Sequence, residues 1–159
     1  MSAVTLHAAR QLARHVRASR PLAPPMWLTD REAELFARMP PPDQFEGVSV
    51  ANALEAWGWG ANRDLLVAGL LHDLGKSLAP AGAHYRVLMT AVETLAPALV
   101  ASMANLSPAI NALARHPSAG ALLAAQAGLP SPVVSLIAGH HQPPEDARMR
   151  ALQRADALY

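Results

Sequence analysis

The chain has 159 residues, and its 13 basic and 12 acidic side chains give a net charge of +1, which is no argument for a nucleic-acid partner or an anionic membrane surface. Cysteine is absent; this excludes disulfides and thiolate metal sites and leads us to expect a cytoplasmic protein. Hydrophobic residues make up 52% and aromatic residues 4% of the chain, and the dominance of Ala, Leu and Val favours packed helices.

Residues 1–20 are expected to form an amphipathic helix, because His and Arg are interleaved with Leu and Ala. The segment lacks the continuous apolar core of a signal peptide. Its basic face is either a solvated surface of the domain or a surface that touches a membrane or a partner. We expect residues 1–40 to be a helical extension packed on the core, and residues 41–159 to form the main helical domain.

Three helices are predicted after the prolines at 21–25. The capping-box pattern at Thr29–Glu32 indicates a helix that runs to Met39. After three further prolines, a second helix is expected over residues 43–57. The third, over residues 63–74, is expected to end at Gly75 in the left-handed cap conformation.

The segment 85–114 has a helical composition but contains Pro97 and Pro108, so two or three helices are expected there. Residues 94–114 carry no charge, and their length is that of a transmembrane helix. Two prolines, two serines and two asparagines lie within them, and Ala dominates where Leu or Ile would be expected. We therefore predict no membrane-spanning helix in this segment.

Three more helices are predicted before the end of the chain. Pro117 opens one that Gly128 closes, and Ser131 is expected to cap the next, which runs to His140. The last is expected over residues 146–158. No segment alternates polar and apolar residues over the length of a strand. The predicted fold is therefore all-α, a compact bundle of seven to nine helices built around helix 63–74.

The dipeptide His72-Asp73 follows a helical segment that is otherwise apolar. Every residue from Leu65 to Leu71 is apolar, which predicts a buried helix rather than a solvated face. Burying an imidazole and a carboxylate without partners would cost several kcal/mol, on the order of the desolvation penalty of each group. We therefore expect a metal ion or a dense hydrogen-bond network to hold this pair.

Other polar residues stand at the ends of predicted helices. They are His116 before Pro117, the pair His140-His141, and Asp156 in the last helix. Taken alone, a histidine at a helix end is usually a capping or surface residue. Asp156, however, shares a helical face with apolar residues, so its carboxylate is expected to point inward and to need a partner.

At this point the sequence resembles a known family. The run His72-Asp73-Leu74-Gly75-Lys76 is similar to the signature of the HD-domain metal-dependent phosphohydrolases, in particular the subset with an HDIG-like motif. Three further elements resemble segments of that family in the same order, and the resemblance covers residues 43–159. These elements are His116–Ala121, Ile137–His141 and Gln153–Asp156.

One position departs from the family pattern. In the run from Asp43 to Ala51, Glu46 stands where the family has its first histidine ligand. The residue lies on the face defined by Val50, Ala53 and Trp57, so its side chain is expected to point inward. There a carboxylate can also ligate a divalent ion. The alternative is a decayed site in which Glu46 forms a salt bridge or reaches solvent.

The resemblance implies an all-α HD-type domain with a central metal cleft that holds one or two divalent ions. Mn, Mg, Fe and Zn are not distinguished. The implied ligands are Glu46, His72, Asp73 and Asp156 for one ion, and His116, His140 and His141 for a second. Asp73 would bridge both ions, and Lys76 would either donate to a phosphate oxygen or act as an ordinary helix C-terminal cation.

The implied reaction is hydrolysis of a phosphomonoester or phosphodiester by a metal-activated water, with Asp73 and Lys76 as catalytic residues. We expect a small phosphorylated, nucleotide-like substrate, and no nucleic-acid partner. The few aromatic residues are expected to belong mostly to the core, so they do not identify the substrate. The alternative is a catalytically impaired regulatory or scaffolding domain with at most a structural metal.

Overall fold

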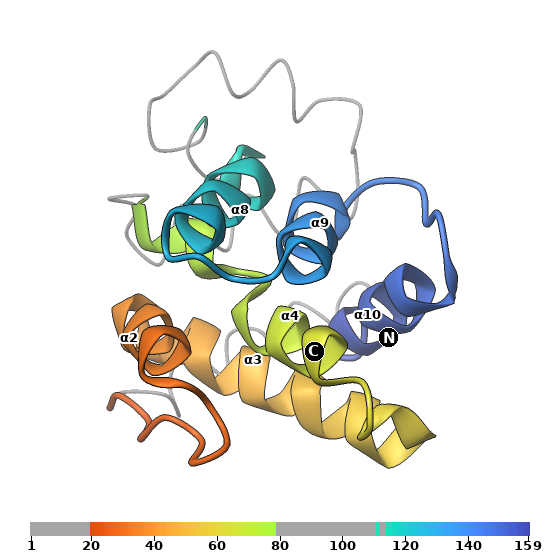
Figure 1. Cartoon of the computed structure of the whole chain (residues 1–159), viewed down its shortest axis with the longest axis horizontal. Helices are drawn as coiled ribbons and strands as arrows, with labels where there is room; N and C mark the ends of the chain where they lie inside the picture. Colours follow the sequence, from red (N-terminus) through yellow and green to blue (C-terminus); the bar gives the residue numbers. More distant parts are fainter. Residues whose placement is uncertain (1–19, 79–110, 112–113) are drawn as a thin grey trace, which may run out of the picture.

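The computed structural model describes residues 20–78, 111 and 114–159. These residues contain α-helices, one π-helical and one 3₁₀-helical segment, and no β-strand (Figure 1). The all-α prediction is therefore confirmed. Residues 1–19 and 79–110, which include most of the predicted N-terminal helix and of the uncharged segment, lie outside this range. None of the described helices is long and apolar enough to cross a membrane.

The described residues form six α-helices, one π-helical segment and one 3₁₀ segment. In chain order they are α2 (Asp30–Arg38), α3 (Pro41–Leu54), the π-helical segment η1 (Glu55–Trp59), α4 (Arg63–Leu71), the 3₁₀ segment η2 (Leu74–Leu78), α8 (His116–Gln126), α9 (Ser131–Gly139) and α10 (Ala147–Asp156). The expected total of seven to nine helices also counted segments outside these residues.

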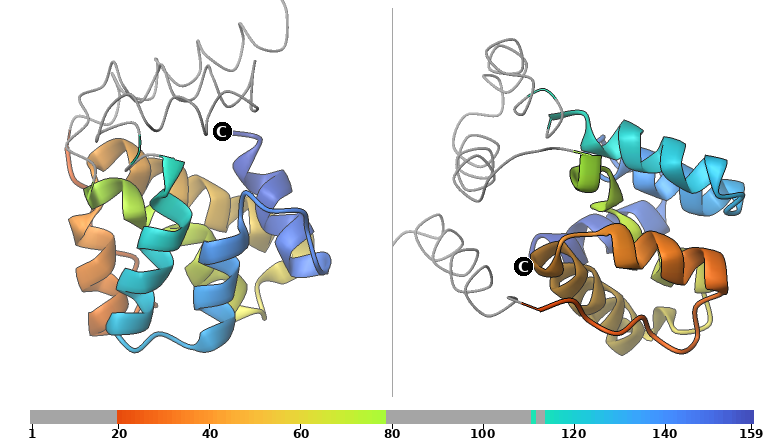
Figure 2. Two further views of the ribbon diagram at one scale, coloured as in Figure 1. Left: turned by 90° about the horizontal axis from the view of Figure 1, so that it is seen from above. Right: turned by 90° about the vertical axis from the view of Figure 1, so that its left-hand side faces the viewer.

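Helix α4 lies at the centre of the described fold. Helices α3 and α9 pack against it, and α10 contacts α3, α4 and α9. Helix α8 packs on α9 and η2, away from α3 (Figures 1 and 2). In α4, Leu65 and residues 67–71 are buried. Burying each of its three buried leucines, Leu65, Leu70 and Leu71, contributes about 1.5–3 kcal/mol of transfer free energy, which explains why the apolar segment occupies this position.

The capping box at the start of α2 is confirmed. The Thr29 hydroxyl accepts a hydrogen bond from the Glu32 N–H, and the Thr29 N–H donates to the Glu32 carboxylate. The same carboxylate accepts two hydrogen bonds from the Arg63 guanidinium, at 2.6 and 2.8 Å. A local helix-start signal therefore also ties α2 to α4.

Two predicted glycine stops have different outcomes. Gly128, at φ 76°, follows α8 as predicted. Gly75 was expected in the left-handed conformation, but among the described residues only Gly58 and Gly128 have positive φ. The prediction for Gly75 is wrong because α4 ends at Leu71 and the chain continues into η2. Gly75 instead allows a close approach, since a Cβ there would lie 2.0 Å from the His116 carbonyl oxygen.

Two further expectations need correction. Ser131 is the first residue of α9 and not its N-cap, which is Pro130; the fixed φ of proline starts the helix without a side-chain hydrogen bond. The aromatic residues were expected mostly in the core, but among those that the structure describes only Phe36 is fully buried, and Trp27, Phe45 and Trp57 are each more than a third exposed. Trp57 instead packs under the Arg154 guanidinium, 4.8 Å from its ring.

Candidate metal centre

His72 is placed by the end of α4, where it forms the C-cap. Its Nδ1 atom lies 2.9 Å from the Gly69 carbonyl oxygen. A carbonyl oxygen only accepts, so Nδ1 carries the proton and Nε2 presents its lone pair in the neutral ring. Nε2 is buried and makes no aligned hydrogen bond, although Asp156 Oδ1 lies 3.2 Å away and Asp73 Oδ2 3.6 Å away. A lone pair that faces two carboxylates requires a cation or a proton between them.

The electrostatics of His72 reflect this requirement. Burial alone would lower the pKa of His72, but the carboxylates of Asp73 and Asp156 raise it to about 10. In turn, burial acts to raise the pKa of Asp156, and the His72 ring outweighs this and holds the pKa below its usual range. The pocket around Nε2 therefore attracts positive charge, whether a proton or a metal ion supplies it.

Glu46 joins this pair from α3. The possible ligand atoms of Glu46, His72 and Asp156 all lie within 4.8 Å of one another, as a metal site requires. Helix α3 reaches this position because Gly47 lets its backbone approach α4, where a Cβ would lie 2.2 Å from the Leu70 carbonyl oxygen. Burial raises the pKa of Glu46 to about 7; the Lys76 ammonium opposes this rise, and the Asp73 carboxylate adds to it.

A second group contains imidazoles only. The possible ligand atoms of His116, His140 and His141 also lie within 4.8 Å of one another. His140 Nδ1 lies 2.7 Å from the Ile137 carbonyl oxygen, so Nε2 of the neutral ring carries the lone pair, and it is 3.1 Å from His116 Nε2. Burial lowers the pKa of His140 well below its usual value and that of His141 to about 4. These two rings are therefore neutral at pH 7, which is the form that binds metals.

Asp73 lies between the two groups. Its Oδ1 atom is 3.1 Å from His116 Nε2, and its Oδ2 atom is 3.6 Å from His72 Nε2. Lys76 forms an ion pair with Oδ2. Burial acts to raise the pKa of Asp73, but Lys76 and the two histidines hold it well below the usual range. Asp73 is therefore an anion with one oxygen toward each group.

The residues predicted from the sequence thus come together in space. Glu46 comes from α3, His72 and Asp73 follow the end of α4, and His116 begins α8. His140 and His141 follow the end of α9, and Asp156 ends α10. Their roles as ligands, and those of Asp73 and Lys76 in catalysis, stay predictions. Sequence reasoning missed the carbonyl groups of Gly69 and Ile137. The available signal was their position three residues before histidines at helix ends.

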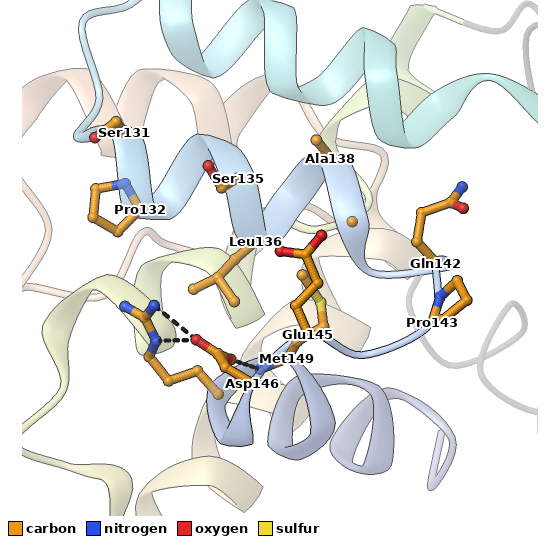
Figure 3. A pocket seen from close by; sticks show the side chains of 12 residues that line it. Ser131, Pro132, Ser135, Leu136, Ala138, Gln142, Pro143, Glu145, Asp146 and Met149 are labelled. Carbon is orange, nitrogen blue, oxygen red and sulfur yellow. Dashed lines mark hydrogen bonds and ion pairs between the residues drawn. The ribbon is translucent and has the colours of Figure 1, made fainter.

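A separate cavity of about 640 Å³ lies between α9 and α10 (Figure 3). None of the predicted ligands lines it. Asp146 on its wall is the N-cap of α10, and its carboxylate also accepts hydrogen bonds from Arg148 at 2.8 and 2.9 Å. The Asp146 carboxylate thus pairs with Arg148 and caps α10, so no ligand is needed to explain either charge. The cavity is therefore a weaker candidate for phosphate chemistry than the site formed by the histidines and carboxylates.

Comparison with known proteins identifies one family. A family model described as HD domain matches residues 48–159. No curated protein and no solved structure matches the chain. The matched segment contains every predicted ligand except Glu46, which lies two residues before it.

Proposed function

This chain belongs to the HD domain family, and from this premise we propose that it is a metal-dependent hydrolase of phosphomonoesters or phosphodiesters. The observation that carries the proposal is the buried Nε2 of His72, which faces two carboxylates without an aligned hydrogen bond. A nucleotide-like substrate is the finer proposal, and it rests on the family resemblance.

The donors fit divalent ions. Glu46, His72 and Asp156 would hold one ion, the three histidines a second, and Asp73 would contribute to both. Mixed imidazole and carboxylate ligands are the usual donors for catalytic divalent metals. A bound ion lowers the pKa of a water molecule toward neutrality and offsets the negative charge of a phosphoryl transition state.

The chain's own residues orient this centre. The Gly69 and Ile137 carbonyls fix the Nδ1 protons of His72 and His140, so both Nε2 atoms are kept ready to bind. Lys76 holds the Asp73 carboxylate in its ionised form. Its side chain is about a quarter exposed, so its ammonium is also placed to donate to a phosphate oxygen of the substrate.

The test is hydrolysis by the purified chain in added Mn(II) or Mg(II). Bis(p-nitrophenyl) phosphate, p-nitrophenyl phosphate and a panel of nucleotides would be the substrates, with product release as the measurement. Asp73→Asn keeps the shape of the side chain but removes its charge, so it should lower turnover by at least about a hundredfold. Equal turnover by the wild type and a folded Asp73→Asn protein would refute the proposal.

One observation favours a second candidate function, a regulatory or scaffolding domain that does not catalyse. Lys76 already places a positive charge next to Asp73, and it opposes the rise that burial causes in the pKa of the neighbouring Glu46. An internal cation of this kind can partly neutralise the carboxylates without a metal ion. If this candidate is correct, the purified chain will contain no metal, and its melting temperature will not change when Mn(II) or Zn(II) is added.

A further inference from the structure

The two groups of the metal centre have unequal donors. The first contains the carboxylates of Glu46 and Asp156 with the His72 imidazole, whereas the second contains three imidazoles and no carboxylate. Asp73 adds one oxygen toward each group, so it does not cancel the difference. Glu46 accounts for half of this inequality, because a histidine there would leave the first group with one carboxylate instead of two.

Donor type decides which ions a site prefers. Carboxylate oxygens suit hard ions such as Mg(II) and Mn(II), whereas imidazole nitrogens suit Zn(II), Ni(II), Cu(II) and Fe(II). Two sites with matched donors would select the same ion. Sites as different as these are suited to different ions.

We propose that this chain holds a mixed-metal centre, in which Glu46, His72 and Asp156 select Mn(II) or Mg(II) while His116, His140 and His141 select a transition ion of the Zn(II) class. The inference rests on the proposed function only in requiring that both groups bind metal. It identifies Glu46 as the residue that gives the first group its second carboxylate.

The surroundings of both groups are suited to keep this difference. Glu46 is 8% exposed and lies where the α3 and α4 backbones approach closely at Gly47. Its carboxylate therefore has little access to solvent. His140 is fixed by the Ile137 carbonyl, and His116 is buried. His141 is exposed, which gives the histidine group a side open to an entering ion.

The experiment uses the full chain after metal removal by a chelator. One equivalent of Zn(II) is added, and Mn(II) is then titrated while the electron paramagnetic resonance signal of free Mn(II) is recorded; elemental analysis follows gel filtration. We expect one zinc and one manganese ion per chain, with zinc not displaced. Release of the zinc ion by manganese, or competition of both metals for one site, would overturn the mixed-metal proposal.

Variants assign each ion to its group. Glu46→His and the isosteric Glu46→Gln should each weaken Mn(II) binding by at least about tenfold, the lower end of the cost of disturbing a metal site, and should keep the zinc ion. His141→Ala, at an exposed position, should weaken Zn(II) binding and keep manganese. Glu145→Gln is the matched control, because Glu145 is an exposed glutamate outside both groups. Unchanged Mn(II) affinity in both folded Glu46 variants would overturn the proposal.

This test is independent of turnover. If the ions bind as expected but no phosphate ester is hydrolysed, the mixed-metal inference stands and the proposed activity fails. If esters are hydrolysed with two identical ions bound, the activity stands and the inference fails.

Discussion

The two ring nitrogens of His72 have different partners. Its Nδ1 proton is held by the Gly69 carbonyl, and its buried Nε2 faces the carboxylates of Asp73 and Asp156. Removing the ring would leave both carboxylates without the group that orients them. We therefore predict that His72→Ala loses the ion held by Glu46, His72 and Asp156. Elemental analysis of the folded variant would show one ion fewer per chain than the wild type, and an unchanged metal content would rule out the assignment.

Asp73 and His116 differ in how many ions they should affect. Asp73 has one oxygen toward each group, whereas His116 belongs to the histidine group only. Asp73→Ala is therefore expected to lose both ions and His116→Ala only one. The measurement is the metal-to-protein ratio after gel filtration. If His116→Ala and the wild type bind equal amounts, the three histidines are packing residues or substrate donors, and the centre is mononuclear.

At the scale of single residues, the sequence predicted which side chains meet but not how they are held. His72, Asp73 and Asp156 could be recognised because polar groups on apolar faces need partners. The Nδ1 contacts with Gly69 and Ile137 were missed. Their position three residues before a histidine is a signal, but the backbone geometry at the helix end decides whether the contact forms. The distances between groups on different helices likewise follow from packing and not from spacing along the chain.

At the scale of elements, Glu32 and Arg63 connect α2 to α4. Burial acts to raise the pKa of Glu32, but the hydrogen bonds from Arg63 and Thr29 outweigh it and hold the pKa below its usual range. A carboxylate whose folded-state pKa is lowered stabilises the fold above its unfolded pKa, and this stabilisation is lost as the pH falls through the folded value. The pair therefore stabilises the protein at neutral pH and not in strong acid.

Glu32→Gln should accordingly lower the free energy of unfolding at pH 7 by about 1–2 kcal/mol, discounted because the Arg63 side chain is 46% exposed. The deficit relative to the wild type should shrink as the pH is lowered below about 4, because the wild-type carboxylate is then protonated as well. Urea unfolding of both proteins across this range checks the prediction. A deficit that is constant with pH would contradict it.

The contact between η2 and α8 depends on Gly75. A Cβ at this position would lie 2.0 Å from the His116 carbonyl oxygen and 2.7 Å from the Gly120 nitrogen. Gly75→Ala must push the two backbones apart, so we expect a loss of stability on the order of 1–3 kcal/mol and weaker metal binding by the group that includes His116.

Gly60→Ala is the control for this substitution. The nearest neighbour of the added Cβ would be Glu55 Cγ at 3.5 Å, an ordinary contact. The free energy of unfolding should therefore change by less than about 0.5 kcal/mol. Thermal melting of both variants with and without Zn(II) provides the measurement. Equal melting temperatures would show that η2 and α8 can separate without cost.

Element boundaries were predictable where a local signal decides them. The capping box of α2 and the stop at Gly128 follow from side-chain and backbone chemistry within a few residues. The end of α4 at Leu71 was not predictable in this way, because the packing of η2 against α8 decides it. The same long-range contact explains why Gly75 does not adopt the expected conformation.

At the scale of the whole molecule, the all-α fold was predictable because no segment has the period of a strand and because Ala and Leu dominate. The arrangement around α4 followed from its apolar sequence. The positions of α8, α9 and α10 relative to α3 were not determined by the sequence pattern, since several helix orders bury the same apolar faces. The resemblance to a family, rather than helix periodicity, identified these helices as the source of the predicted ligands.

Because the predicted ligands come from α3, α4, α8, α9 and α10, bound metal would link most of the described helices. An ion that binds the folded state alone stabilises it by about 2.7 kcal/mol at a hundredfold excess over its Kd. For a chain of this size, that corresponds to a rise in melting temperature of roughly 5–10 °C. Calorimetry of the metal-free wild type with added Mn(II) and Zn(II) should show this rise. It should be smaller for His72→Ala and absent for Asp73→Ala, and a wild-type melting temperature that does not respond to either metal would count against a preformed centre.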